Sequence, residues 1–304
     1  MKKLFSILLC FVLVLSFCAC TAQKKEETEK EEEQLKFTYD AAYSSYDESA
    51  VNAYEKLCQS VMDYSSELRM NTGLLDNVLQ LFYTSFPLSA LVKDLTVNDD
   101  ESGVDIVYKY NESEHNAKTE QFINTVKETY KKCSEGSTNK TVYAIKLYNY
   151  IASSVTLNTD KTGIDETVSC LDTILSGYGS SFSYSQYFEY MLRYNDIPAY
   201  HILSSDAIGA GWGLAGAVLD NNLYYFDILS EYYDNGGEKL KYFGMTSEDV
   251  RNEGLKDLKY TSQSGAPDAS DLKFDICRKC DKWELDGAKL LVTIKSGKVV
   301  EVAL

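Results

Sequence analysis

Residues 177–227 decide the fold, and they read GYGSSFSYSQYFEYMLRYNDIPAYHILSSDAIGAGWGLAGAVLDNNLYYFD. Early in this stretch, apolar residues recur with the spacing of one buried helix face, i, i+3, i+4, i+7 and i+8: Tyr184, Tyr187, Phe188, Met191 and Leu192. Ser181 or Ser183 follows a glycine-rich turn and can serve as the N-cap. Pro198 stops the helix, because the residue before a proline avoids helical backbone angles.

Extended segments follow this helix. Ile197–Leu203 is predicted as a strand, and Gly213–Leu219 and Leu223–Leu229 are predicted as the two strands of a hairpin. Asp220-Asn221-Asn222 supplies turn residues between them. A helix packed on an antiparallel sheet predicts an α+β fold.

Turn, helix and antiparallel hairpin in this order resemble the core of the transglutaminase-like superfamily, which has a papain-like fold. Members carry a pattern like G-V-C-Q-G-Y-A at the helix start, followed by H-A-W-N-x-V and then W-Y-x-V-D. Laid on these patterns without gaps, Ser181 takes the place of the nucleophilic cysteine, Trp212 that of the histidine base, and Asp227 that of the orienting aspartate. Leu147–Ile151 and Tyr242–Val250 also resemble flanking motifs of the family.

The resemblance implies a thiol catalytic site, but two of its three positions carry other residues. Such a site needs a nucleophile, a base in hydrogen-bond reach and a carboxylate that orients the base. The indole of Trp212 has an N–H donor and no acceptor, so it cannot take a proton. Ser181 would need a competent base, because a hydroxyl is far less acidic than a thiol. The sequence therefore predicts a degenerate member of the family, a pseudoenzyme rather than an enzyme.

An active alternative stays open, in which Ser181 works with His201 as a hydrolase or amidase. His201, on the predicted strand, is interpreted as a partly buried strand residue, and His115, in a polar stretch, as a surface residue. Cys170 is interpreted as a small core residue rather than a shifted nucleophile. With no imidazole to orient, Asp227 is expected at a strand end, hydrogen-bonded to backbone or to a Tyr or Trp side chain.

Aromatic residues gather in the stretches that carry the catalytic positions. The candidate binding residues among them are Phe182, Tyr184, Trp212 and Tyr225. Tyrosine and tryptophan combine a large contact area with a polar tip, which suits a peptide or a sugar polymer. The predicted ligand is therefore a peptide or a cell-wall polymer such as peptidoglycan, and the alternative is that these rings only pack the core.

Residues 1–20 read MKKLFSILLCFVLVLSFCAC, a basic start followed by an apolar run, which is the pattern of an export signal. Ala19 directly before Cys20 resembles a bacterial lipobox, so Cys20 is the predicted lipidated residue of an anchored lipoprotein. An ordinary cleaved signal peptide is the alternative. The charged segment 21–36 is predicted to be a solvated tether. These features predict an exported protein, held by lipid on the outer face of the cell membrane.

The rest of the chain divides into three predicted regions. Residues 37–135 form an N-terminal α/β extension, 136–261 the transglutaminase-like domain, and 262–304 a small β module with a hairpin turn at Ser296-Gly297. Amphipathic helices are predicted at 51–61, 74–83, 119–132 and 141–154.

Charge and cysteine usage exclude some partners. The net charge of −16 repels nucleic-acid phosphates, so no nucleic-acid partner is predicted.

Cys277 and Cys280 form a single CxxC motif without a second pair or a histidine at zinc spacing. We therefore predict no metal and no cofactor, and expect either a local disulfide or two free thiols there.

Overall fold

The chain has two compact units, Met1–Lys36 and Phe37–Leu304, and every element named below belongs to the second. The structure, a computed structural model, describes residues 35–156, 168–205, 211–260 and 265–304. The predicted export signal, Cys20 and nearly all of the predicted tether lie outside these residues. Within the described ranges, no helix is both long and apolar enough to cross a membrane.

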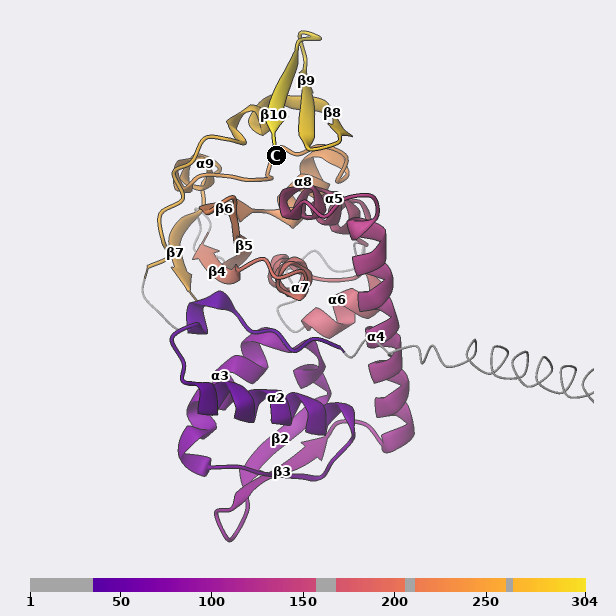
Figure 1. The fold of residues 1–304 in the computed structure, drawn as a ribbon, viewed down its shortest axis with the longest axis vertical. Helices are drawn as coiled ribbons and strands as arrows, with labels where there is room; N and C mark the ends of the chain where they lie inside the picture. Colours follow the sequence, from indigo (N-terminus) through magenta and orange to yellow (C-terminus); the bar gives the residue numbers. More distant parts are fainter. Residues whose placement is uncertain (1–34, 157–167, 206–210, 261–264) are drawn as a thin grey trace, which may run out of the picture. The chain divides into compact units, whose positions relative to one another are not determined.

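The first part of the second unit combines helices with a small antiparallel sheet (Figure 1). Its elements are α2 (Glu48–Met62), β1 (Glu67–Arg69), α3 (Leu75–Ser85), β2 (Val92–Val97), β3 (Gly103–Tyr108) and α4 (Glu112–Ser134), with short 3-10 turns at Ala41–Tyr43, Thr72–Leu74 and Pro87–Leu91. The strand order is β1-β3-β2. Phe86 has an extended backbone before Pro87, so α3 ends at Ser85, two residues beyond the predicted end at residue 83.

The middle of the unit contains the predicted helix and hairpin. Its elements are α5 (Lys140–Ser153), α6 (Cys170–Ser176), α7 (Ser181–Tyr194), β4 (Ala199–Ser205), β5 (Gly211–Leu219), β6 (Asn222–Phe226), α8 (Ile228–Asn235), α9 (Ser247–Asn252) and β7 (Lys256–Tyr260). The strands form one antiparallel sheet in the order β6-β5-β4-β7. Helix α7 packs against β4 and β5 (Figure 1). The α+β class is confirmed, and its order of elements is the one that the transglutaminase-like resemblance implied.

The C-terminal β module is a three-stranded antiparallel sheet. A 3-10 turn at Asp275–Lys279 leads into β8 (Cys280–Asp286), β9 (Lys289–Ile294) and β10 (Val299–Ala303), in the order β10-β9-β8. Gly297 has a φ of 81°, which a glycine adopts without strain, and the hairpin predicted at this turn is confirmed.

The buried face of α7 joins the core to the sheet. Tyr184, Phe188, Met191 and Leu192 are buried, as their spacing predicted. The ring of Phe188 lies 5.2 Å from that of Phe226 on β6, centroid to centroid. Full burial of one such side chain stabilises a fold by about 1.5–3 kcal/mol, so this contact fixes α7 on the sheet.

Two predicted boundaries are wrong at positions that matter for the site. Helix α7 takes Ser180 as its N-cap, in a capping box with Ser183, so Ser181 is the first helical residue and not the cap. Strand β6 ends at Phe226 and does not continue to Leu229, because the Asp227 side chain accepts from the Ser230 backbone N–H and starts α8.

His115 is the third correction, because it is a core residue and not the predicted surface residue. Helix α4 begins well before the predicted start at residue 119 and includes this histidine. The side chain is fully buried, and its Nε2 lies 2.7 Å from the Val61 carbonyl oxygen. Its ring also makes edge contacts with Tyr64 and Tyr108. Burial lowers the pKa of His115, which favours the neutral imidazole found in structural sites.

Candidate functional site

Ser181, at the position of the family's nucleophile, lies at the start of α7 and is buried. The Gly213 backbone N–H on β5 donates to its Oγ at 3.1 Å. One turn later, the Ser185 hydroxyl donates to the Gly213 carbonyl at 3.0 Å. The first turn of α7 is thus held against β5 by a pair of hydrogen bonds around one glycine.

Trp212, at the position of the family's base, contacts Asp227 directly. Its indole Nε1–H donates to Asp227 Oδ2 at 2.8 Å. Asp227 is 2% exposed and accepts two further hydrogen bonds from Ser230, from the backbone N–H at 2.9 Å and from the hydroxyl at 2.7 Å. The expectation that Asp227 sits at a strand end, bonded to backbone and to a tryptophan N–H, is confirmed.

Burial raises the pKa of Asp227 to about 6, and the bonds from Ser230 and Trp212 act in the opposite direction. The carboxylate serves as the N-cap of α8 and as the anchor of the indole at the same time. Asp227 therefore joins β5 to the first turn of α8, and among the described residues no side-chain acceptor is hydrogen-bonded to Ser181.

The three aligned positions are therefore brought together through consecutive residues of β5. Trp212 reaches Asp227, and its neighbour Gly213 reaches Ser181. A general base must lie within hydrogen-bond distance of the nucleophile it activates. Within the described ranges, no imidazole is hydrogen-bonded to Ser181. The geometry holds α7, β5 and α8 together.

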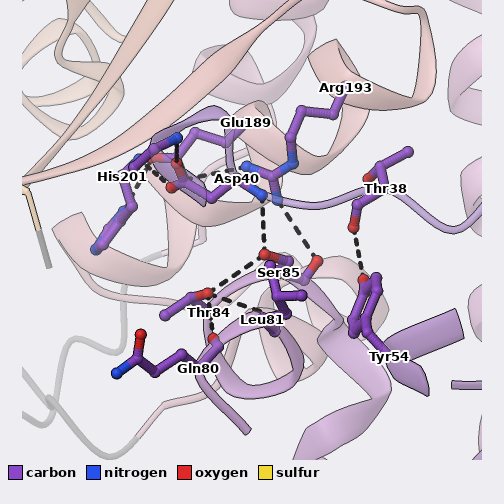
Figure 2. A network of polar contacts seen from close by, with 11 residues as sticks. Thr38, Asp40, Tyr54, Gln80, Leu81, Thr84, Ser85, Glu189, Arg193 and His201 are labelled. Atoms are coloured by element: carbon purple, nitrogen blue, oxygen red, sulfur yellow. Dashed lines mark hydrogen bonds and ion pairs between the residues drawn. The ribbon is translucent and has the colours of Figure 1, made fainter. Parts of the chain in front are cut away.

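His201, the base in the alternative interpretation, belongs to a separate buried network (Figure 2). Its Nδ1 lies 2.9 Å from Glu189 Oε1, and its backbone N–H donates to Asp40 Oδ2 at 2.7 Å. The side chain is 3% exposed, so His201 is a strand residue as interpreted, but it is fully rather than partly buried. Its ring lies 6.4 Å from that of Phe182, centroid to centroid.

Arg193 and Ser85 extend this network. Arg193 Nη1 lies 3.8 Å from Glu189 Oε2, and its Nη2 donates to the Ser85 carbonyl at 3.5 Å. The Ser85 hydroxyl in turn accepts from the Asp40 backbone N–H at 2.9 Å. Figure 2 shows how these groups converge from α3, α7, β4 and the segment before α2. The carboxylates of Asp40 and Glu189 balance the charges of Arg193 and of His201 when this histidine is protonated.

The protonation of this pair follows from its surroundings. Burial opposes a charge on His201, but the carboxylates of Glu189 and Asp40 overcome this effect and raise the pKa of the imidazole. Burial also raises the pKa of Glu189. The two groups therefore titrate as a coupled pair that shares a proton.

Sequence reasoning missed this network, although part of it had a signal. Glu189 and Arg193 stand at i and i+4 among apolar residues of one helix, a spacing that allows a buried ion pair. Asp40 carries no comparable signal, because its partner His201 lies 161 residues away.

Two of the four predicted binding residues are core residues, which corrects the prediction for them. Tyr184 and Tyr225 are 1% and 0% exposed. Their hydroxyls donate to the Gly177 and Pro267 carbonyls, so both ring and polar tip are satisfied internally. Phe182 and Trp212 are half-buried and keep part of their surface accessible.

The CxxC motif holds no disulfide. Cys277 and Cys280 are free thiols, which is one of the two states expected for the CxxC motif. Over the described ranges, no group of three or more metal-ligating side chains comes together.

Comparison with known proteins gives distant structural likenesses only. No protein-family model matches the chain, and no curated protein matches it. A solved structure described as a presumed cysteine protease from Cytophaga hutchinsonii is 16% identical, with a TM-score of 0.31 over 49% of this chain and 55% of that one. A TGase structure is 11% identical, with a TM-score of 0.31 over 40% of this chain and 34% of that one.

A third solved structure, described as a presumed protease from Parabacteroides distasonis, is 14% identical, with a TM-score of 0.24 over 43% of this chain and 29% of that one. The chain thus spans about half the length of the first of these structures and about a third of the other two. The activities of these three proteins are therefore not assigned to this chain.

Proposed function

We propose that this chain is a non-catalytic binding protein with a degenerate transglutaminase-like domain, exported and held at the outer face of the membrane by a lipid on Cys20. The observation that carries the non-catalytic part is the 2.8 Å hydrogen bond from Trp212 Nε1 to Asp227. At the position where the family carries its proton acceptor, this chain carries the indole of Trp212, which is a hydrogen-bond donor only.

The residues at the aligned positions support a large loss of catalytic rate relative to a complete triad. Removal of the nucleophile or of the base alone lowers catalysis on the order of a millionfold in well-studied triads. Here the aligned base is an indole, and the aligned serine accepts a backbone hydrogen bond. A hydroxyl without a base does not attack an amide at a useful rate.

Anchoring is supported by the amino-terminal sequence. A short apolar run ends at Ala19-Cys20, and a highly charged segment follows before the folded unit. Two or three acyl chains would hold such a protein firmly on a membrane. Mass spectrometry of the mature protein is expected to find an acylated amino terminus at Cys20. An unmodified terminus elsewhere contradicts this part of the proposal.

The proposed ligand is a peptide or a peptidoglycan fragment, bound across the accessible edges of Phe182 and Trp212. Aromatic rings that are half-buried provide rigid apolar contact at little entropic cost. These are the two predicted binding residues that keep accessible surface.

One set of measurements tests this function. Peptidase and amine-exchange assays on the parent, Ser181→Ala and His201→Ala are expected to give no activity above buffer for any of the three. Calorimetric titration with peptides and peptidoglycan fragments is expected to detect binding, and Phe182→Ala is expected to weaken it. This variant is chosen because it leaves the hydrogen bond between Trp212 and Asp227 in place. An activity that either of the first two variants abolishes would establish the active alternative and refute the pseudoenzyme.

A further inference from the structure

A basic cavity lies apart from the degenerate site, where the end of α8 meets the C-terminal β module. Its volume is about 550 Å³, within the usual range of small-ligand pockets. The cavity is lined by one carboxylate, Asp234, and by five basic side chains: Lys239, Lys241, Arg278, Lys279 and Lys295. Such an excess of cations is unexpected in a chain whose net charge is −16.

Two of these cations are already neutralised by carboxylates. Lys239 Nζ lies 3.2 Å from Asp281, and Lys241 Nζ lies 2.8 Å from Asp234. Lys241 is also 3.7 Å from Glu253.

The other three cations form no ion pair with any residue that the structure describes: Arg278, Lys279 and Lys295. They come from the 3-10 turn before β8 and from the hairpin between β9 and β10. Both lysines are exposed and can adjust to a ligand, whereas the arginine is half-buried.

Arg278 places a permanent charge in the wall of the cavity. Its Nη2 donates to the Phe243 carbonyl. Its Nε and Nη1 are buried, with no hydrogen-bond partner among the described residues. The nearby carboxylate of Glu231 instead accepts from Tyr148 and from the Tyr242 backbone N–H. The guanidinium, with two N–H-bearing nitrogens left unbonded, adds to the positive charge of the wall, and the Glu231 carboxylate offsets part of that charge.

We propose that this cavity binds a phosphate-bearing ligand with two or more negative charges. Lysine ammonium groups bind phosphate oxygens as mobile point charges, and several of them around one hollow favour a polyanion over a single carboxylate. The source would be either a small phosphate ester or a repeating polyol-phosphate polymer, and both present the same group. This proposal is independent of the one for Phe182 and Trp212, which lie elsewhere in the fold.

Calorimetric titration of the purified protein with inorganic pyrophosphate and with a glycerol-phosphate oligomer tests the proposal. Binding of either probe supports it, and the tighter one identifies the source. Lys279→Ala and Lys295→Ala are each expected to weaken binding by at least about tenfold, the usual loss of one hydrogen bond to a charged group. Both lysines are exposed, so these variants are expected to unfold at the same midpoint as the parent.

Lys298→Ala is the matched control, because Lys298 is exposed on the same hairpin and does not line the cavity. It is expected to change affinity less than twofold, since charges apart from the site are screened by salt. The proposal is overturned if neither probe binds, if Lys298→Ala weakens binding as much as Lys295→Ala, or if citrate binds as tightly as pyrophosphate.

Discussion

Glu189→Ala is expected to lower the free energy of unfolding by about 3–5 kcal/mol, the usual loss when one partner of a buried charge pair is removed. Glu189 is fully buried, and its carboxylate faces His201 at 2.9 Å and Arg193 at 3.8 Å. The alanine would leave both basic groups inside the protein without this carboxylate. Urea unfolding followed by circular dichroism measures the loss.

The loss is also expected to depend on pH. The folded pKa of His201 is raised above its unfolded value, so its contribution to stability is complete below about pH 6.5 and is lost as pH rises through the folded pKa. The difference in stability between the parent and Glu189→Ala should therefore narrow as pH rises above about 6.5.

Glu189→Gln is the matched control for this variant. The amide keeps the volume of the side chain, and its oxygen can still accept from His201 Nδ1, although the negative charge is gone. It is expected to cost about 1–3 kcal/mol, less than alanine. A loss below about 1 kcal/mol for Glu189→Ala would contradict the buried network described here.

Gly213→Ala is expected to destabilise the fold by about 1–3 kcal/mol through overpacking between α7 and β5. A Cβ on Gly213 would lie 2.6 Å from Phe182 Cα and 2.8 Å from the Phe182 backbone nitrogen. Backbone atoms in the first turn of a helix cannot rotate away as a side chain can. The substitution should also lengthen the hydrogen bond from Gly213 N–H to Ser181 Oγ, which is 3.1 Å in the parent.

Gly216→Ala, on the same strand, separates this clash from a general effect of alanine in β5. Its Cβ would lie 3.3 Å from Ile202 Cγ1, a side-chain atom that needs to move by only a few tenths of an ångström, whereas the contacts at Gly213 are with backbone atoms. We expect a change of less than about 1 kcal/mol, because alanine restricts the unfolded chain more than glycine does. Equal midpoints for the two variants in urea would contradict the close approach at Gly213.

Much of the fold could be predicted from local pattern. The spacing of apolar residues located α7 and its buried face, and the turn residues located the hairpins β5–β6 and β9–β10. The prediction was wrong where a side chain changed the local preference. Asp227 begins α8 with a capping hydrogen bond, and this ended a strand that the apolar residues after it had favoured.

The burial of individual polar and aromatic residues could not be predicted from local sequence pattern. His115 was predicted at the surface because its neighbours are polar, yet the Val61 carbonyl of α2 is hydrogen-bonded to its Nε2. Tyr184 and Tyr225 were predicted to bind a ligand, yet carbonyl groups on separate loops accept from their hydroxyls. In each case the deciding partner is remote in sequence or lies in an irregular segment.

The sequence by itself determined that Trp212 cannot accept a proton, because an indole has an N–H donor and no acceptor in any fold. It also determined the helix and hairpins, since apolar spacing and turn residues act over a few neighbours. Only the tertiary structure decided that Trp212 bonds to Asp227 and that Asp40 reaches His201. The partner of a buried polar group depends on which distant segments meet, and that is settled by packing of the whole unit.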